Sequence, residues 1–417
     1  MKALLRDAIA VAAVSGLVFQ ALRQWVGEHY VVPTNSMQPT LYGDGDRGDV
    51  VFVDKLARVG SLQRYDLAVF RVPGEGADVV KRVVAFGDEC IEPRDGDLWV
   101  GPSPQHLQRL QKDPLADRDL RVPWLRWPGP QPGGRPLTAY LRGSADPAAV
   151  ALPTLPDEAG ARATCTVDAR RAAAAASLDA EGPHWLATVR AIDVSYLDIR
   201  GGRGNADADL LVQDCGVDLE VAPSGVQALL CAIDLRPDCW TVRWQLETGA
   251  VELWRNGETL ATGQLPRDLV PAGRTAPVRV EFGHLDGRLF LIVDGRADAV
   301  WVEARRAEWI TADPGPTAWP LPKNRLALAV LGAGPAPVVR IEVFRDLHWY
   351  RLPMEIGIDP ATAQPARTVP GGHIYLLGDN STDSRDSRMF GPVPARAFIG
   401  RPRAVLGPWP RLRMLRR

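Results

Sequence analysis

Residues 33–41 read PTNSMQPTL, and they place one serine, Ser36, between an apolar N-terminal segment and a long body. Two later stretches are interpreted together with it. Residues 79–84 read VVKRVV, and residues 378–388 read GDNSTDSRDSR. A serine hydroxyl is a weak nucleophile at neutral pH and requires a base within hydrogen-bonding distance. The identity of that base decides which chemistry Ser36 can perform.

Lysine is the base that the sequence offers. His373 lies near the third stretch, but no aspartate forms a triad pattern with it, and the GxSxG motif is absent. Lys81 is flanked by apolar residues, and on an alternating strand Lys81 and Arg82 point to opposite faces. Burial removes solvation from an ammonium group and makes its neutral form accessible. We therefore expect Lys81 in a dry site and Arg82 beside a carboxylate; a surface lysine and a structural loop serine are the alternatives.

An apolar segment precedes the serine. Residues 8–26 read AIAVAAVSGLVFQALRQWV, and at about 1.5 Å per residue a helix of these 19 residues nearly spans a bilayer core. Lys2 and Arg6 before it favour a cytoplasmic N-terminus and an extracytoplasmic body. We expect an uncleaved single-pass anchor in the cell membrane. A cleaved signal peptide and a buried globular helix are the competing interpretations.

The composition is that of a folded protein with more than one domain. The chain has 417 residues, of which 46% are hydrophobic and 24% charged, and a formal net charge of −1 gives no reason to expect a nucleic acid partner. The C-terminal tail is basic, which suits anionic lipid headgroups, although a solvated chain end explains it equally well.

Five cysteines show neither CxxC spacing nor a Cys/His cluster, so zinc is not expected; they are Cys90, Cys165, Cys215, Cys231 and Cys239. Cys231 and Cys239 are candidates for a disulfide if this part is extracytoplasmic, and free buried thiols are the alternative.

Apolar alternation and turn residues predict a mostly β fold. Strands are expected over 49–54, 66–72 and 79–86, followed by a hairpin over 91–100. Between 160 and 348, short β-like segments alternate with turns such as Asp286-Gly287 and Asp294-Gly295, which is typical of an all-β sandwich. Residues 280–295 look like a strand pair of concanavalin-like or laminin-G-like jelly rolls.

We therefore predict a catalytic β core that is split by an insertion. In chain order the parts are a cytoplasmic N-terminus at 1–7, a transmembrane anchor at 8–26, the first part of the core at 27–91, an irregular Pro/Gly-rich connection at 92–159, an inserted jelly-roll-like β-sandwich at 160–348, a return linker at 349–367, the second part of the core at 368–408 and a basic tail at 409–417.

Together the three stretches resemble the type I signal peptidases, the Ser/Lys proteases that cut signal peptides from exported proteins. The resemblance rests on Ser36-Met37-x-Pro39-Thr40, on the Lys-Arg strand, and on Gly378-Asp379-Asn380 followed by Ser384-x-Asp386-Ser387-Arg388. Residues 81–88, KRVVAFGD, lack the proline that usually follows the lysine strand in this family, and the family pattern does not predict the insertion.

The resemblance implies roles for the matching residues. Ser36 matches the nucleophile and Lys81 the general base, while Thr34 and the Ser36 N–H match the oxyanion hole. Met37 would pack beneath the site. In the third stretch Ser384 matches the serine that hydrogen-bonds and orients the lysine.

Two charged pairs would support the site, or serve stability alone: Asp386 with Arg388, and Asp379 with Arg82. The substrate would lie as an added strand. It would run beside Tyr30, Val31 and Val32 and beside Asp78, Val79 and Val80.

These roles imply a membrane-anchored serine endopeptidase that cleaves signal peptides from exported preproteins through an acyl-enzyme, with no metal or other cofactor. One alternative is a Ser/Lys protease whose insertion recruits particular exported proteins. Another is a membrane-anchored binding protein whose sandwich binds a glycan or a protein and whose catalytic stretches are relics. A self-cleaving repressor-type protease is disfavoured by the anchor and by the lack of a DNA-binding helix pair before Ser36.

Overall fold

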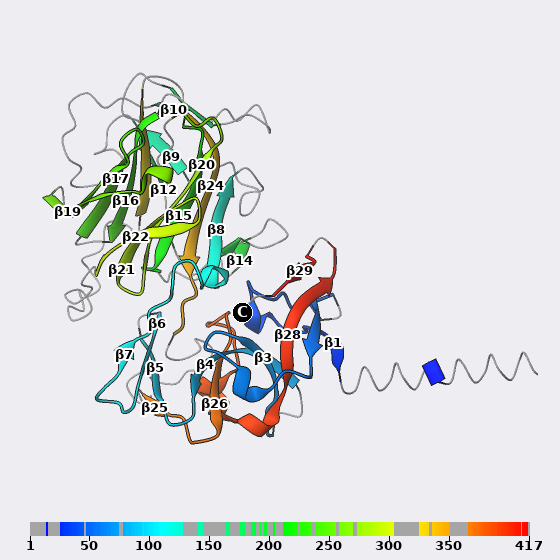
Figure 1. Ribbon diagram of the computed structural model, residues 1–417. Helices are drawn as coiled ribbons and strands as arrows, with labels where there is room; N and C mark the ends of the chain where they lie inside the picture. Colours follow the sequence, from blue (N-terminus) through cyan, green and yellow to red (C-terminus); the bar gives the residue numbers. More distant parts are fainter. Residues whose placement is uncertain are drawn as a thin grey trace, which may run out of the picture. The chain divides into compact units, whose positions relative to one another are not determined.

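Figure 1 shows a computed structural model of the protein, which describes residues 14–15, 26–45, 47–74, 78–94, 96–127, 141–144, 164–166, 176–179, 185–188, 192, 196–197, 203–204, 212–223, 226–235, 238–255, 258–269, 273–303, 325–332, 336–350, 366–409 and 411–415. The expected anchor at 8–26 lies outside the described residues, apart from Val14, Ser15 and Val26. Within the described ranges, no helix combines the length and apolar character that crossing a membrane requires.

The prediction of a mostly β protein is confirmed, and the chain divides into two units. Unit 1 contains Met1–Leu110 and His348–Arg417, and unit 2 contains Gln111–Leu347. Part of the expected irregular connection at 92–159 is instead regular structure. The strand β8 (Arg121–Trp127) pairs with β24 (Ala336–Asp346) of unit 2, and β9 (Leu141–Ser144) pairs with β12 (Trp185–Thr188). Proline and glycine around β8 concealed its apolar residues.

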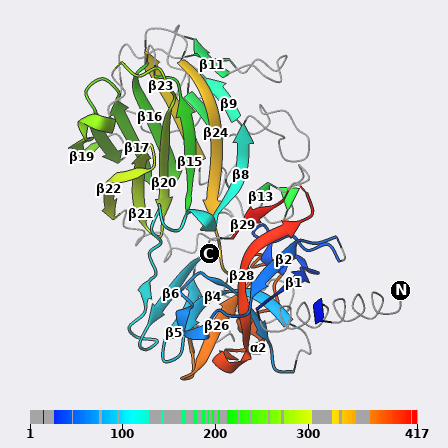
Figure 2. The ribbon, with the colours of Figure 1, turned by 45° about the vertical axis from the view of Figure 1, so that its right-hand side comes forward.

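Unit 1 contains two antiparallel sheets. The larger has the order β1 (Gly27–Val31), β2 (Val50–Asp54), β28 (Phe398–Gly407), β3 (Leu67–Arg71), β4 (Asp78–Phe86), β26 (His373–Leu377) and β27 (Val393–Pro394), with β29 (Arg413–Met414) beside β28. The smaller has the order β25 (Arg367–Thr368), β5 (Cys90–Arg94), β6 (Asp97–Gly101) and β7 (Gln108–Arg109). Figure 2 shows the late strand β28, in red, beside the early strand β2, in blue.

The order of the larger sheet brings distant parts of the chain together. β4 pairs with β3 on one side and with β26 on the other, so the lysine strand lies beside the strand that leads into the 378–388 stretch. Alternation in β2 buries Val51 and Val53 in one apolar cluster with Met37 and Leu41. Burying each of these apolar side chains contributes about 1.5–3 kcal/mol of stabilising free energy, which fixes the serine loop to this sheet.

In the described residues, unit 2 contains one eight-stranded and one seven-stranded sheet, which pack around one apolar core. The first has the order β10 (Thr164–Thr166), β11 (Ala176–Asp179), β24, β15 (Cys215–Val221), β20 (Val278–Leu285), β21 (Arg288–Val293) and β22 (Arg296–Glu303), with β8 beside β24. The second has the order β19 (Glu258–Gln264), β18 (Ala250–Arg255), β17 (Asp238–Gln245), β16 (Val226–Leu235), β23 (Arg325–Gly332), β12 and β9. A two-stranded pair, β13 (Tyr196–Leu197) and β14 (Arg203–Gly204), is also present.

Two hairpins of unit 2 turn at the predicted Asp-Gly pairs. The φ angles are 47° at Asp286 and 82° at Gly287, and 48° at Asp294 and 79° at Gly295. Positive φ at both central residues is the tight-hairpin geometry that Asp-Gly accommodates.

The suggested disulfide between Cys231 and Cys239 is not present. Cys231 is a free, buried thiol that lies opposite Val242 in the β16–β17 pair, whereas Cys239 lies opposite Asp234. Cys90 and Cys215 are also free and buried.

Candidate active site

A short 3-10 helix, η1 (Asn35–Met37), carries Ser36. Thr34 precedes it in an extended conformation, and Met37 at its end is fully buried. The Met37 side chain packs in the same cluster as Leu67 of β3, beneath the site as expected. The buried Met37 side chain therefore fixes the helix, while Ser36 remains partly exposed.

Lys81 reaches the serine from β4. Its backbone lies opposite Ala68 of β3, its side chain is buried with 3% exposure, and its Nζ is 2.5 Å from the Ser36 Oγ in a hydrogen bond. Burial lowers the pKa of Lys81 from 10.5 to about 8, against the opposing effect of the Asp386 and Asp379 carboxylates. A base poised near neutral pH, in contact with a hydroxyl, is the arrangement that nucleophilic catalysis by serine requires.

Thr34 lies beside the same hydroxyl. The Thr34 Oγ1 is 3.3 Å from the Ser36 Oγ, and Thr34 is an exposed residue. A hydroxyl beside a nucleophile is one kind of donor that can stabilise an oxyanion.

Arg82 points away from Lys81 and forms the ion pair expected with Asp379. The Arg82 Nε donates to Asp379 Oδ1 at 2.7 Å and Nη2 to Oδ2 at 2.5 Å, with both side chains at 0% exposure. The Arg82 Nη1 also donates to the Tyr65 carbonyl at 2.6 Å, and the Thr40 hydroxyl donates to Asp379. The pair joins β4, the serine loop and the third stretch, and breaking such a buried pair typically costs about 3–5 kcal/mol.

Asp386 organises the loop that follows β26. It caps α2 (Ser387–Phe390), and it receives the Arg388 Nε at 2.8 Å and Nη2 at 2.7 Å. It also accepts the Gly378 N–H at 2.9 Å. The second expected charged pair is therefore present, and it positions the backbone at Gly378.

Ser384 does not make the hydrogen bond to Lys81 that the resemblance implied. Its Oγ is buried and has no hydrogen-bond partner among the residues that the structure describes. It packs instead against Gly378: a Cβ built on Gly378 would lie 2.0 Å from this oxygen and 2.5 Å from the Ser36 carbonyl oxygen. The lysine is oriented by burial and by Ser36, while Ser384 contributes close packing.

Asn380 contacts the serine helix η1, a role that the sequence did not predict. Its backbone N–H donates to the Ser36 carbonyl at 3.1 Å, and its Nδ2 donates to the Asn35 carbonyl at 3.2 Å. The 378–388 stretch is thus hydrogen-bonded to the carbonyl groups of η1. Its place after Gly378-Asp379 was the only signal for it in the sequence.

The predicted substrate strands have free edges in the described structure. Among the described residues, β26 pairs with β4 only from Arg82 onward, so Asp78, Val79, Val80 and Lys81 have no partner strand on that side. In the same part of the chain, β1 pairs with β2 alone, which leaves the outer edge of Tyr30 and Val31 open. Val32 follows β1 and is buried.

Comparisons with known proteins match two segments of this chain to one family. Residues 5–123 and 355–409 match the family described as signal peptidase, peptidase S26. A protein of Mycobacterium tuberculosis named signal peptidase I is 30% identical over 146 residues, covering 27% of this chain and 49% of that protein. The chain thus spans about half the length of this relative.

Two further similarities are more limited. Mitochondrial inner membrane protease subunit 1 of Schizosaccharomyces pombe is 49% identical over 39 residues, covering 9% of this chain and 25% of that protein. A Bacillus subtilis protein of unknown function with a galectin-like fold covers 54% of this chain and 98% of that chain, with 9% identity and a TM-score of 0.29.

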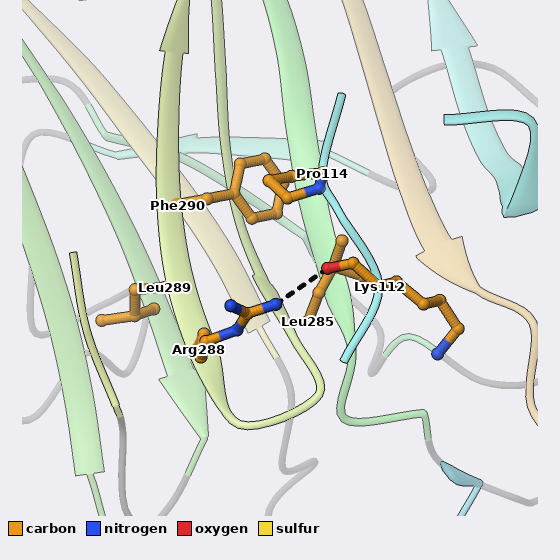
Figure 3. Close-up of a pocket in the computed structure, with 6 residues that line it drawn as sticks. All are labelled: Lys112, Pro114, Leu285, Arg288, Leu289 and Phe290. Atoms are coloured by element: carbon orange, nitrogen blue, oxygen red, sulfur yellow. Dashed lines mark hydrogen bonds between the residues drawn. The ribbon is translucent and has the colours of Figure 1, made fainter. Parts of the chain in front are cut away.

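Unit 2, most of which lies between the two matched segments, has buried charges of its own. The Lys112 Nζ lies 2.7 Å from both Asp286 and Asp346, and burial raises the pKa of Asp346 to about 7. A small hollow nearby is lined by Lys112, Pro114, Leu285, Arg288, Leu289 and Phe290 (Figure 3). The Arg288 Nη2 donates to the Lys112 carbonyl there at 2.9 Å. This lining contains no nucleophile with a base beside it.

Proposed function

We propose that unit 1 is a Ser/Lys endopeptidase that cleaves signal peptides from exported preproteins, with Ser36 as nucleophile and Lys81 as general base. The observation that carries the proposal is the contact of 2.5 Å between the Lys81 Nζ and the Ser36 Oγ, with the lysine buried and its pKa lowered to about 8. Similarity to peptidase S26 signal peptidases supports the class of substrate.

Acylation uses the neutral form of Lys81. The Lys81 Nζ takes the proton of the Ser36 hydroxyl as the Ser36 Oγ attacks the scissile carbonyl carbon. The Ser36 N–H and the Thr34 hydroxyl stabilise the negative charge on the carbonyl oxygen. The C–N bond then breaks, and the ammonium of Lys81 returns its proton to the leaving amine. The product is an ester between Ser36 and the signal peptide.

Deacylation repeats these steps with water. Neutral Lys81 removes a proton from a water molecule, the resulting hydroxide attacks the ester carbonyl, and Lys81 delivers the proton to the Ser36 Oγ. One base thus serves both half-reactions because the apolar surroundings keep its pKa near working pH.

The substrate would bind in an extended conformation as an added strand. The open edges of Asp78–Val80 in β4 and of Tyr30 and Val31 in β1 offer backbone groups for this pairing. Backbone hydrogen bonds read no sequence, so small side chains near the cut would be selected by shallow pockets along this edge.

We also infer that the C-terminal hairpin of unit 1, formed by β28 and β29, lies at a membrane surface. Four large apolar residues there are exposed: Leu406 at 50%, Trp409 at 81%, Leu412 at 50% and Met414 at 73%. Arg413, whose guanidinium donates to the Thr40 carbonyl, lies among them and ties the hairpin to the serine loop. Exposed tryptophan and leucine beside arginine suit an interface with anionic lipid.

The membrane contact is testable by separating two kinds of substrate. In vesicles that contain anionic lipid, Trp409→Ala should slow cleavage of a membrane-inserted preprotein several-fold and leave cleavage of a soluble peptide unchanged. Met389→Ala, which also removes a side chain of 42% exposure, is the matched control. If the Trp409 variant and the wild type cleave each substrate at the same rate, the inference that this hairpin contacts the membrane is wrong.

The principal test uses the purified full chain and a preprotein with a signal peptide. The wild type should release the mature protein, and Ser36→Ala and Lys81→Ala should reduce the rate to background while their unfolding transitions remain cooperative. Ser61→Ala, in an exposed residue outside the site, is the control. Cleavage by the Ser36→Ala variant at the wild-type rate would refute the proposal.

A further inference from the structure

The chain that leaves unit 2 contributes a tryptophan to the interior of unit 1. Trp349 has an exposure of 0%, and its backbone N–H donates to the Gly96 carbonyl at 3.1 Å. It lies outside the segments 5–123 and 355–409 that match peptidase S26. A buried residue that accompanies the insertion is therefore part of the catalytic unit.

The first contact of Trp349 is with the loop beside the serine. Its Nε1 donates to the Gly378 carbonyl at 3.2 Å. Gly378 packs so closely against Ser384 and the Ser36 carbonyl that no Cβ fits between them. A displacement of Gly378 would therefore change the position of Ser36, because interiors packed at this density transmit small shifts.

The second contact of Trp349 is with the loop behind the lysine. Its ring stacks on that of Tyr65, with centroids 6.2 Å apart and planes 6° apart. The Tyr65 carbonyl accepts the Arg82 Nη1 at 2.6 Å, and Arg82 follows Lys81 directly in β4. The same indole thus supports both the nucleophile side and the base side of the site.

The next residue, Tyr350, adds two contacts to the same loop. Its backbone N–H donates to the Ser381 Oγ at 2.8 Å, and its carbonyl accepts the Arg388 Nη1 at 3.0 Å. Arg388 also donates to Ser381 at 2.7 Å, which closes a small network. The return segment and the 378–388 stretch are therefore joined at three points.

We propose that Trp349 and Tyr350 are positioning residues for the Ser36–Lys81 site. In this arrangement the return segment of the insertion holds the 378–388 stretch against η1, a support that the matched family segments do not contain. The catalytic consequence rests on the proposed function, whereas the structural support does not.

Trp349→Phe tests the role of the indole N–H, because it keeps an aromatic ring against Tyr65 and removes only the donor to Gly378. Amide hydrogen exchange over residues 378–384 should become about tenfold faster than in the wild type. The kcat for preprotein cleavage should fall about tenfold with KM changed less than twofold, since the substrate edge is untouched. The pH profile of kcat/KM should move to higher pH as water gains access to Lys81.

Trp254→Phe in unit 2 is the matched control, because it also removes an indole donor, to Thr259 at 3.1 Å. It should leave exchange over 378–384 and turnover unchanged. Ser381→Ala is the second variant: it removes the acceptor of Tyr350 and should also speed exchange over 378–384. It decides the matter if Trp349→Phe does not fold.

If Trp349→Phe and Ser381→Ala both show the amide exchange rate, the kcat and the pH profile of the wild type, the positioning role is refuted. A wild type that cleaves no preprotein would refute the proposed function alone. In that case faster exchange in the variants would still support the positioning role, and unchanged exchange would still refute it.

Discussion

Replacement of Lys81 by methionine should make unit 1 more stable at neutral pH while it abolishes cleavage. In the folded protein the pKa of Lys81 is lowered from 10.5 to about 8, because burial disfavours the ammonium form. The folded state therefore binds fewer protons than the unfolded state between these two values. The free energy of unfolding of the wild type then rises with pH across this window, and this contribution is absent in the methionine variant.

The size of the effect follows from the two pKa values. The lowering of the Lys81 pKa from 10.5 to about 8 corresponds to about 3 kcal/mol at pH 7, where both states carry the charge. By pH 9.5 the unfolded state still binds the proton, and the penalty falls to about 1.4 kcal/mol. The stability advantage of Lys81→Met over the wild type should therefore shrink by about 2 kcal/mol between pH 7 and pH 9.5.

The assay must follow unit 1 separately from unit 2. Cys90 in β5 is a free thiol with 0% exposure in unit 1, so its alkylation as a function of guanidinium, measured by mass spectrometry, reports the unfolding of that unit. Effects that do not depend on pH, such as the lost bond to Ser36, cancel when the two pH values are compared. An advantage that is the same at pH 7 and pH 9.5 would show that the pKa of Lys81 is ordinary.

Three further predictions concern the 378–388 stretch. Gly378→Ala should reduce kcat/KM at least tenfold, because its Cβ would clash with Ser384 and the Ser36 carbonyl, while Gly60→Ala, with open space around it, should be neutral in the same preprotein assay. Asn380→Ala should lower kcat/KM several-fold, since η1 loses the amide bond, and its Tm should fall by no more than a few degrees in a calorimetric scan. Asp386→Asn should lower the free energy of unfolding of unit 1 by about 3–5 kcal/mol in the Cys90 alkylation assay, because it leaves a buried guanidinium unpaired.

The parts of the fold that the sequence predicted are those written in local patterns. Apolar alternation located β2, β3 and β4, and Asp-Gly pairs located two hairpins of unit 2. The apolar residues on both sides of Lys81 predicted its burial, and β4 buries Lys81 and Arg82 on opposite faces. The start of unit 2 was missed because prolines and glycines around β8 obscured a strand whose partner, β24, lies far along the chain.

The parts of the site that the sequence missed depend on contacts between distant residues. Trp349 gave no signal, since a tryptophan in a linker shows neither its stacking partner nor its carbonyl acceptor. Ser384 was expected to bond to Lys81, yet Gly378 has no side chain and lets this serine pack against the backbone instead. Such packing is decided by side-chain volumes in three dimensions, which spacing along the chain does not record.

The pH dependence of preprotein cleavage tests the central claim most directly, which is that a neutral Lys81 activates Ser36. We predict that kcat/KM rises tenfold per pH unit below pH 7 and levels off above an apparent pKa of about 8, as the buried lysine loses its proton. A rate that is independent of pH from 6 to 10 would contradict it.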